Sequence, residues 1–159
     1  MKQRRQAKIK AIIESEIIET QDELAAALRA RDFDVTQATV SRDIREMKLV
    51  KMATAEGRYR YATPESQGLN LAAHRLQGLL RDMVISLFPS ENLILIKTLP
   101  GAAGVVAAAI DQAKLKDVMG TVAGHDTLLA VIKTKTAVAA VLTKLENMRE
   151  MNDAEQKAE

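Results

Sequence analysis

The sequence contains no cysteine and no tryptophan, and its only histidines are His74 and His125. Without cysteine the chain has no disulfide, no thiolate metal site and no cysteine nucleophile. Two histidines alone do not complete a tetrahedral zinc site, because such a site takes four protein ligands when it is structural. We therefore expect a protein without a bound metal and without a cofactor.

Aromatic residues are also scarce, since two phenylalanines and two tyrosines are the only ones in 159 residues. Hydrophobic residues still make up 47% of the chain, so we expect a core of aliphatic side chains and alanine rather than disorder. No uncharged stretch reaches 18 residues, and the first residues lead into a charged segment. These features predict a soluble, cytoplasmic protein with no membrane partner.

The net charge of only +2 hides an uneven distribution along the chain. Residues 1–64 hold 13 basic and 10 acidic side chains, a net charge of +3, and the remainder has a net charge of −1. Five of the first ten residues are basic and none is acidic. This cluster is either a solvated helix end or a patch that binds phosphate groups, and the charge pattern alone leaves both interpretations open.

The chain divides into two modules at a stretch of turn formers, residues 62–68. We predict a first domain over residues 1–64, a linker over 65–72, and a second domain over 73–150. Residues 151–159 are polar and are expected to form a flexible tail.

Helical spacing of apolar residues predicts three helices in the first module. The first covers residues from about 7 to 17, and the second begins at Thr20, which has capping-box spacing with Glu23. Thr36 is the predicted N-cap of a third helix that runs to about Met47.

On the third helix, Val40, Ile44 and Met47 form one narrow apolar stripe. At about 100° per residue, the opposite face carries small, hydroxyl and arginine side chains: Ala38, Thr39, Ser41, Arg42 and Arg45. A helix that enters the major groove of DNA needs this combination, because arginine forks bind guanine edges or phosphates and small residues leave room. An ordinary exposed helix face is the alternative interpretation.

A basic β-hairpin is predicted directly after the third helix, with strands at 48–52 and 58–61 and a turn at Gly57. Three helices followed by such a hairpin are typical of a winged helix-turn-helix. Arg58 and Arg60 are then placed to bind backbone phosphates, and we expect Tyr59 and Tyr61 to pack into the core.

The second module alternates helices and strands. We predict helices at 69–88, 101–113 and 136–148, a strand at 92–98, and a hairpin of strands 118–123 and 127–133. This order predicts an α/β layer with a mostly antiparallel sheet, so the fold class of the whole chain is α+β.

Two loops of the second module have unusual compositions. Residues 99–104 join strand to helix with small residues, which allow either close approach of a ligand or another subunit, or tight packing of the helix on the sheet. Residues 120–127 place His125 beside Asp126 at a glycine-containing bend. An enzyme that uses this pair is a third hypothesis, but no nucleophile elbow, P-loop or dinucleotide fingerprint accompanies it, so we expect no enzymatic activity.

Several segments in this order resemble the bacterial arginine repressor family over nearly the full chain. They are IETQDEL at 18–24, VTQATVSRDI at 35–44, GRYRY at 57–61, TLPGAA at 98–103 and GTVAG at 120–124. The resemblance implies a winged-helix domain that binds palindromic, double-stranded operator DNA, with Gln37, Thr39, Ser41 and Arg42 among the contacts. It further implies a C-terminal domain that forms trimers and stacks two trimers as a hexamer.

The resemblance also implies that L-arginine binds between trimers as a co-repressor of arginine biosynthesis, and it leaves activation of arginine catabolism open. The implied effector residues are Ala123, Gly124, His125 and Asp126 in one loop, with Asp111 and Gly104 on the preceding helix. Where the family usually has Gly-Asp-Asp-Thr, this chain has a histidine at position 125, which removes one carboxylate that suits a cationic ligand. The alternative function is therefore a paralogue that binds DNA without sensing arginine directly, acting with a paralogous repressor as partner.

Overall fold

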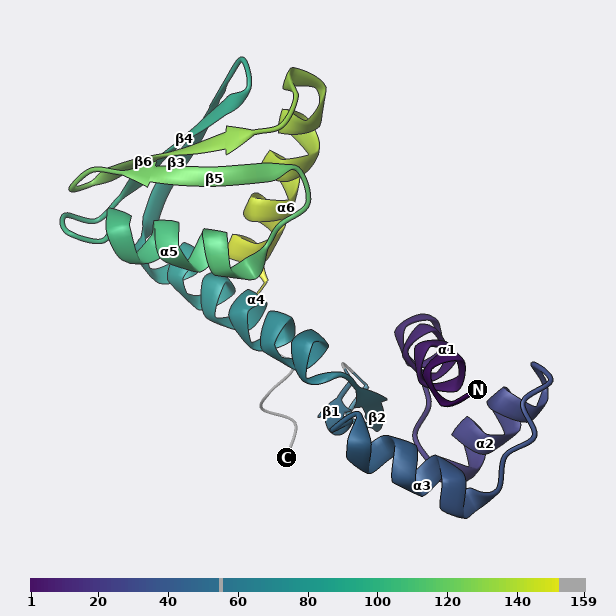
Figure 1. Cartoon of the computed structure of the whole chain (residues 1–159). Helices are drawn as coiled ribbons and strands as arrows, with labels where there is room; N and C mark the ends of the chain where they lie inside the picture. The colour runs from purple at the N-terminus through teal and green to yellow at the C-terminus, as the bar shows by residue number, and fades with distance from the viewer. Residues whose placement is uncertain (55, 152–159) are drawn as a thin grey trace. The chain divides into compact units, whose positions relative to one another are not determined.

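The computed structural model describes residues 1–54 and 56–151 (Figure 1). It contains two compact units, an N-terminal unit of Met1–Gly68 and a C-terminal unit that begins at Leu69. Helices and an antiparallel sheet occur together, so the predicted α+β class is confirmed. The expected tail at 151–159 lies outside the described residues except for Met151.

The N-terminal unit is a three-helix bundle followed by a hairpin, as predicted. Its elements are α1 (Lys2–Ser15), α2 (Gln21–Arg29), α3 (Gln37–Glu46), β1 (Val50–Ala53) and β2 (Tyr59–Ala62). β1 and β2 pair antiparallel, and Gly57 has a φ of +75° in the hairpin turn, a conformation that favours glycine. The core is aliphatic, as the scarcity of aromatics requires: Ile9, Ile12, Ile13, Ile18, Leu24, Leu28, Val35, Val40 and Ile44.

Both predicted helix caps are present. The Thr20 Oγ1 accepts a hydrogen bond from the Glu23 N–H at 3.1 Å, and the Thr36 Oγ1 accepts one from the Thr39 N–H at 3.3 Å. The Glu23 carboxylate reaches back to the N–H of Glu19 at 2.8 Å, one residue before the position that a standard capping box uses. These bonds set where α2 and α3 begin.

One expectation about the hairpin is wrong. Tyr61 is buried in the core, but Tyr59 is 59% exposed. Tyr59 pairs with Ala53 in the last pair before the turn, beyond the three-helix core, whereas Tyr61 pairs with Lys51 closer to it. Position along the strand therefore decides burial, and side-chain alternation alone does not.

The predicted linker at residues 65–72 contains the boundary between the two units, between Gly68 and Leu69, but it is not a segment of turns. Residues 65–72 are helical and belong to α4 (Pro64–Met83). The Thr63 Oγ1 accepts a hydrogen bond from the Ser66 N–H at 3.2 Å, Pro64 follows it, and Glu65 lies in the first turn. Residues that break a helix in its interior favour its start, so these turn formers begin a helix here.

The C-terminal unit consists of helices on one face of a four-stranded antiparallel sheet. After α4 come β3 (Val84–Ser90), β4 (Leu93–Thr98), α5 (Ala103–Ala113), β5 (Val118–Ala123), β6 (Thr127–Ile132), a short 3-10 helix η1 (Lys135–Ala137) and α6 (Val138–Glu150). The strand order is β3-β4-β6-β5. The expected helix at 69–88 is thus too long, because its last residues pair with β4 as strand β3.

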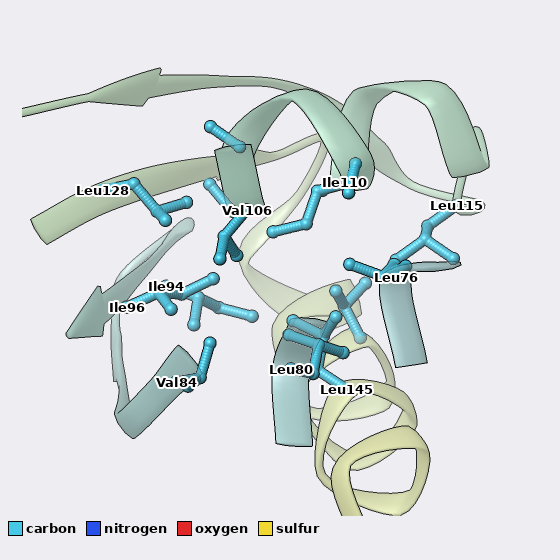
Figure 2. Close-up of a cluster of buried hydrophobic side chains, with 14 of the residues drawn as sticks. Leu76, Leu80, Val84, Ile94, Ile96, Val106, Ile110, Leu115, Leu128 and Leu145 are labelled. Carbon is cyan, nitrogen blue, oxygen red and sulfur yellow. The ribbon is translucent and has the colours of Figure 1, made fainter. Parts of the chain in front are cut away.

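The core of this unit lies between the sheet and its helices. Leu76 and Leu80 of α4, Val106 and Ile110 of α5, and Leu145 of α6 point toward Ile94 and Ile96 of β4 and Leu128 of β6 (Figure 2). Of the described residues, no helix is long and apolar enough to cross a membrane.

The other face of the sheet is also apolar at its centre. Phe88, Leu95, Leu129 and Val122 are direct cross-strand partners from β3 to β5, so their side chains share one face. Phe88 and Val122, at the two ends of this row, are more than half exposed. The C-terminal unit therefore presents an uncovered apolar row, defined here by these four residues.

Candidate DNA-binding surface and effector loop

Helix α3 buries one side and exposes the side predicted to contact DNA. Val40 and Ile44 are buried against the other helices. The opposite side exposes Gln37, Ala38, Arg42 and Arg45 and leaves Thr39 and Ser41 half-buried. No ion pair within the described residues involves Arg42 or Arg45, so both guanidinium groups are available to bases or phosphates.

The Thr39 side chain has a second role that the sequence reading missed. Its hydroxyl lies 3.0 Å from the Thr36 hydroxyl, within the N-cap of α3. If Thr39 contacts DNA, its hydroxyl does so while it is already hydrogen-bonded to Thr36.

Asp43 is the main α3 residue that sequence reasoning missed. It is only 1% exposed, and its carboxylate binds Arg5 of α1 through two hydrogen bonds, from Nε at 2.5 Å and from Nη2 at 3.0 Å. Gln6 donates a third hydrogen bond at 3.2 Å. The sequence feature that identifies Asp43 is an acidic residue three positions after Val40, on the side of α3 that carries the apolar stripe.

The surroundings of Asp43 hold it in the charged form. Burial raises the pKa of its carboxyl, but the hydrogen bonds from Arg5 and Gln6 and the positive charges of Arg5 and Lys2 outweigh this effect. The pKa of Asp43 consequently lies below its ordinary value.

Three of the five basic residues at the start of the chain form ion pairs with carboxylates. Lys2 pairs with Glu46, Arg5 with Asp43, and Lys10 with Glu65. Arg4 and Lys8 line a shallow pocket of about 330 Å³ together with Arg31 and Phe33. Phosphate binding thus remains a prediction for Arg4 and Lys8. The other three residues, Lys2, Arg5 and Lys10, are paired with carboxylates of the protein.

The wing arginines have different surroundings. Arg58 is exposed and pairs with Glu56 at 2.8 Å and Glu19 at 3.1 Å, and these carboxylates raise the pKa of its guanidinium. Arg60 is half-buried. A phosphate that binds Arg58 would compete with these two carboxylates for its N–H groups.

The two unusual loops of the C-terminal unit meet at the start of α5. The His125 carbonyl accepts hydrogen bonds from the N–H groups of Gly101 at 3.0 Å and Ala103 at 3.4 Å, and the Asp126 carbonyl accepts one from Thr98 at 2.8 Å. Gly101 has a φ of +80° and follows Pro100, as in a type II turn. Backbone hydrogen bonds therefore hold the residue 124–126 bend against the residue 99–102 turn.

The side chains at this bend are open to solvent. Ala123, Gly124, His125 and Asp126 are exposed, as is Gly104 in the first turn of α5. The Asp126 Oδ1 accepts a hydrogen bond from the Thr127 hydroxyl at 2.8 Å, and Lys97 donates to the same hydroxyl at 2.7 Å. The Thr127 hydrogen bond and the Lys97 charge lower the pKa of Asp126, so the bend presents a carboxylate.

Asp111 is not part of this cluster. It accepts a hydrogen bond from the Thr121 hydroxyl at 3.0 Å and lines an open cleft of about 410 Å³ between α5 and β5. It lies eight residues after Ala103, or about 12 Å along the helix. Within one chain the structure brings Gly104 and residues 123–126 to one end of α5 and leaves Asp111 at the other.

The geometry of the N-terminal unit defines the class of protein. A three-helix bundle with a basic hairpin and an exposed arginine-bearing face on its third helix is a winged helix-turn-helix, the fold of a DNA-binding transcriptional regulator. Comparison with known proteins agrees: residues 1–69 match the family model "Arginine repressor, DNA binding domain", and residues 80–147 match "Arginine repressor, C-terminal domain". The chain belongs to the arginine repressor family.

Relatives named arginine repressor are similar along almost their entire length. The protein from Moorella thermoacetica is 50% identical over 150 residues, which cover 94% of this chain and 99% of the relative. That from Carboxydothermus hydrogenoformans is 49% identical over 146 residues, covering 92% and 97%. That from Symbiobacterium thermophilum is 48% identical over 148 residues, covering 93% and 98%.

Proposed function

We propose that this protein is a sequence-specific repressor of arginine biosynthesis genes, that it reads operator DNA with α3, and that it responds to L-arginine. The observation that carries the proposal is the exposed arginine face of α3, on a helix whose other face is locked into the bundle, in a chain of the arginine repressor family. A helix with one buried and one arginine-bearing face is suited to the major groove.

In this proposal the predicted DNA contacts divide by type. Gln37, Thr39, Ser41, Arg42 and Arg45 lie on or beside the exposed side of α3 and contact base edges and adjacent phosphates. Arg58 and Arg60 of the wing contact phosphates outside the groove. Arginine forks contribute specificity at bases, whereas phosphate contacts set position and salt dependence.

The apolar row on the open sheet face supports self-association through the C-terminal unit. A row from Phe88 to Val122 that is left in water is unfavourable, and a second copy of the same face would remove it from water. A trimer, or a dimer of trimers, places several DNA-binding units on one particle. Two of them would then bind the two halves of a palindromic operator.

The effector proposal uses the bend at residues 123–126. Asp126 is an exposed carboxylate, which suits the guanidinium or ammonium group of L-arginine. Because Asp111 lies at the far end of α5, a site that uses both carboxylates takes Asp111 and Asp126 from different subunits. Oligomerisation would then complete the effector site, with Gly104 and Gly124 leaving space for the ligand.

A second candidate function is favoured by His125. This side chain is exposed beside Asp126, where the family usually has a carboxylate, so the bend has one negative charge fewer for a cationic ligand. In this version the protein binds the same DNA but senses arginine weakly or only together with a paralogous repressor.

Calorimetric titration of L-arginine into the purified protein separates the two candidates. Heat that saturates at millimolar arginine and disappears in Asp126→Asn supports direct sensing. The absence of heat supports the second candidate, and His125→Asp then tests its cause, because the added carboxylate is expected to restore binding. L-citrulline, which lacks the guanidinium charge, is the matched control ligand.

DNA binding itself is tested by footprinting on duplexes selected from a random library by the wild-type protein. A protected palindrome that widens or strengthens with arginine supports the repressor assignment. Protection that is the same on every duplex would contradict sequence-specific reading.

A further inference from the structure

The N-terminal turn of α1 is fastened to the C-terminal half of α3. Arg5 binds both carboxylate oxygens of Asp43, and Gln6 bridges Asp43 at 3.2 Å and Glu46 at 2.9 Å. Lys2 adds an ion pair to Glu46 at 2.7 Å. The partners on α3 are one helical turn apart, so these contacts form one clamp, defined here by these five residues.

The centre of the clamp is buried. The Asp43 side chain is 2% exposed and the Arg5 side chain 19%. Removing two charges from water is unfavourable, and apolar residues of similar volume often stabilise a protein as well or better. Stability alone is therefore a weak reason for an ion pair at this position.

Geometry supplies a stronger reason. The apolar contacts of Val40 and Ile44 are non-directional, so they resist separation of the helices more than rotation of α3 about its axis. A bidentate guanidinium–carboxylate pair fixes both distance and angle. Rotating a helix by about 20° moves a side-chain tip at its surface, roughly 5–6 Å from the axis, by about 2 Å. Such a shift breaks a hydrogen bond to a base edge.

We propose that Arg5 and Asp43 are positioning residues for DNA reading, which hold α3 in the rotation that lets Arg42 and Arg45 meet base edges. The proposal rests on the proposed function of α3 as the reading helix. It assigns Arg5 to the contact between α1 and α3, although this residue belongs to a basic cluster whose composition suggests contact with phosphates.

Asp43→Asn distinguishes positioning from simple electrostatics by the sign of its effect. Asparagine is nearly isosteric with aspartate, and the variant gains one positive charge relative to wild type. If only charge matters, it binds every duplex more tightly. If Asp43 positions α3, affinity for the selected duplex falls while affinity for a scrambled duplex is unchanged or rises. Loss of one base-edge contact lowers the specificity ratio by about fivefold or more.

Two further variants separate positioning from folding. Arg5→Lys keeps the cation but loses the fork, so its specificity ratio is expected to lie between wild type and Asp43→Asn. Glu16→Gln is the matched charge control, because it removes one carboxylate from the ion pair between Glu16, the C-cap residue of α1, and Arg31, away from α3. Its specificity ratio is expected to equal that of wild type.

The experiment measures fluorescence anisotropy of labelled selected and scrambled duplexes with the full chain, well below the melting temperature of each variant. A lower ratio for Asp43→Asn and Arg5→Lys, with Glu16→Gln unchanged, supports the proposal. A wild-type ratio in folded Asp43→Asn or Arg5→Lys, together with a lost ratio in Arg42→Ala, overturns positioning and leaves the reading helix intact. A wild-type ratio in Arg42→Ala together with a wild-type ratio in Asp43→Asn overturns the assignment of α3 as the base-reading helix and the positioning role together.

Discussion

Arg42→Ala is the most direct test of whether α3 reads DNA. Arg42 is exposed and has no ion-pair partner within the described residues, so truncating it removes no salt bridge among them and little buried surface. Surface substitutions of this kind change the free energy of unfolding by about 0.5 kcal/mol or less. The variant is therefore expected to stay folded, so a loss of affinity for DNA reports lost contacts between Arg42 and DNA.

The size of that effect depends on which part of DNA Arg42 contacts. A bidentate contact with a guanine edge contributes about 1–3 kcal/mol of discrimination, or roughly a 5- to 150-fold loss of affinity for the selected duplex. If two copies of α3 bind one palindrome, the free-energy loss is about twice as large. Affinity for a scrambled duplex is expected to change little.

Salt dependence identifies the other possibility. A phosphate contact contributes about 0.9 to the slope of log K against log salt, whereas a base contact contributes little to it. Anisotropy titrations at four or five potassium chloride concentrations measure slope and specificity together. Arg58→Ala of the wing is the matched arginine control, and it is expected to lower both affinities and reduce the slope.

An equal loss on both duplexes with a smaller slope would show that Arg42 contacts phosphate, and the base-reading role would then be wrong. An unchanged affinity for the selected duplex would remove Arg42 from the interface altogether.

Three other predictions follow from the contacts described above. Thr20→Ala removes the N-cap of α2 and is expected to lower the free energy of unfolding of the N-terminal unit by about 1 kcal/mol, measured by urea denaturation, with the exposed Thr136→Ala as control. Because the pKa of Asp43 is lowered in the folded protein, its stabilising contribution is present above the ordinary value of about 3.9 and is lost as pH falls through the folded pKa. The free energy of unfolding of Asp43→Asn is thus expected to depend less steeply on pH in this range than that of wild type. The same pH dependence in both proteins would contradict a charged Asp43 in the folded state. Phe88→Asp places a charge in the apolar row and is expected to shift the sedimentation coefficient to smaller assemblies, whereas Ile17→Asp, an exposed apolar residue of the N-terminal unit, is expected not to.

Local features explain which parts of the fold are predictable from the sequence. The caps at Thr20 and Thr36 and the apolar stripe from Val40 to Ile44 involve residues within a few positions of one another. This local pattern therefore predicts where α2 and α3 begin and end, and which side of α3 faces the core. The exposed face with Arg42 follows from the same periodicity, because the side opposite a buried stripe faces solvent.

The errors have non-local causes. Residues 84–88 continue an apolar pattern that suits a helix, but pairing with β4 makes them a strand. The turn formers near Pro64 start α4 because Thr63 caps it, and the same residues in another setting would end a helix. Tyr59 differs from Tyr61 only in its distance from the helical core.

The sequence by itself determined the winged-helix order of elements, the outward face of α3 and the bend at residues 123–126, since these follow from spacing, capping and resemblance. Only the tertiary structure decided which charges are free. Lys2, Arg5 and Lys10 face carboxylates that lie 44, 38 and 55 positions further along the chain, and Asp111 is separated from Asp126 by the length of α5. Charge pairing depends on which helices pack together, and packing partners distant in sequence leave little trace in local periodicity.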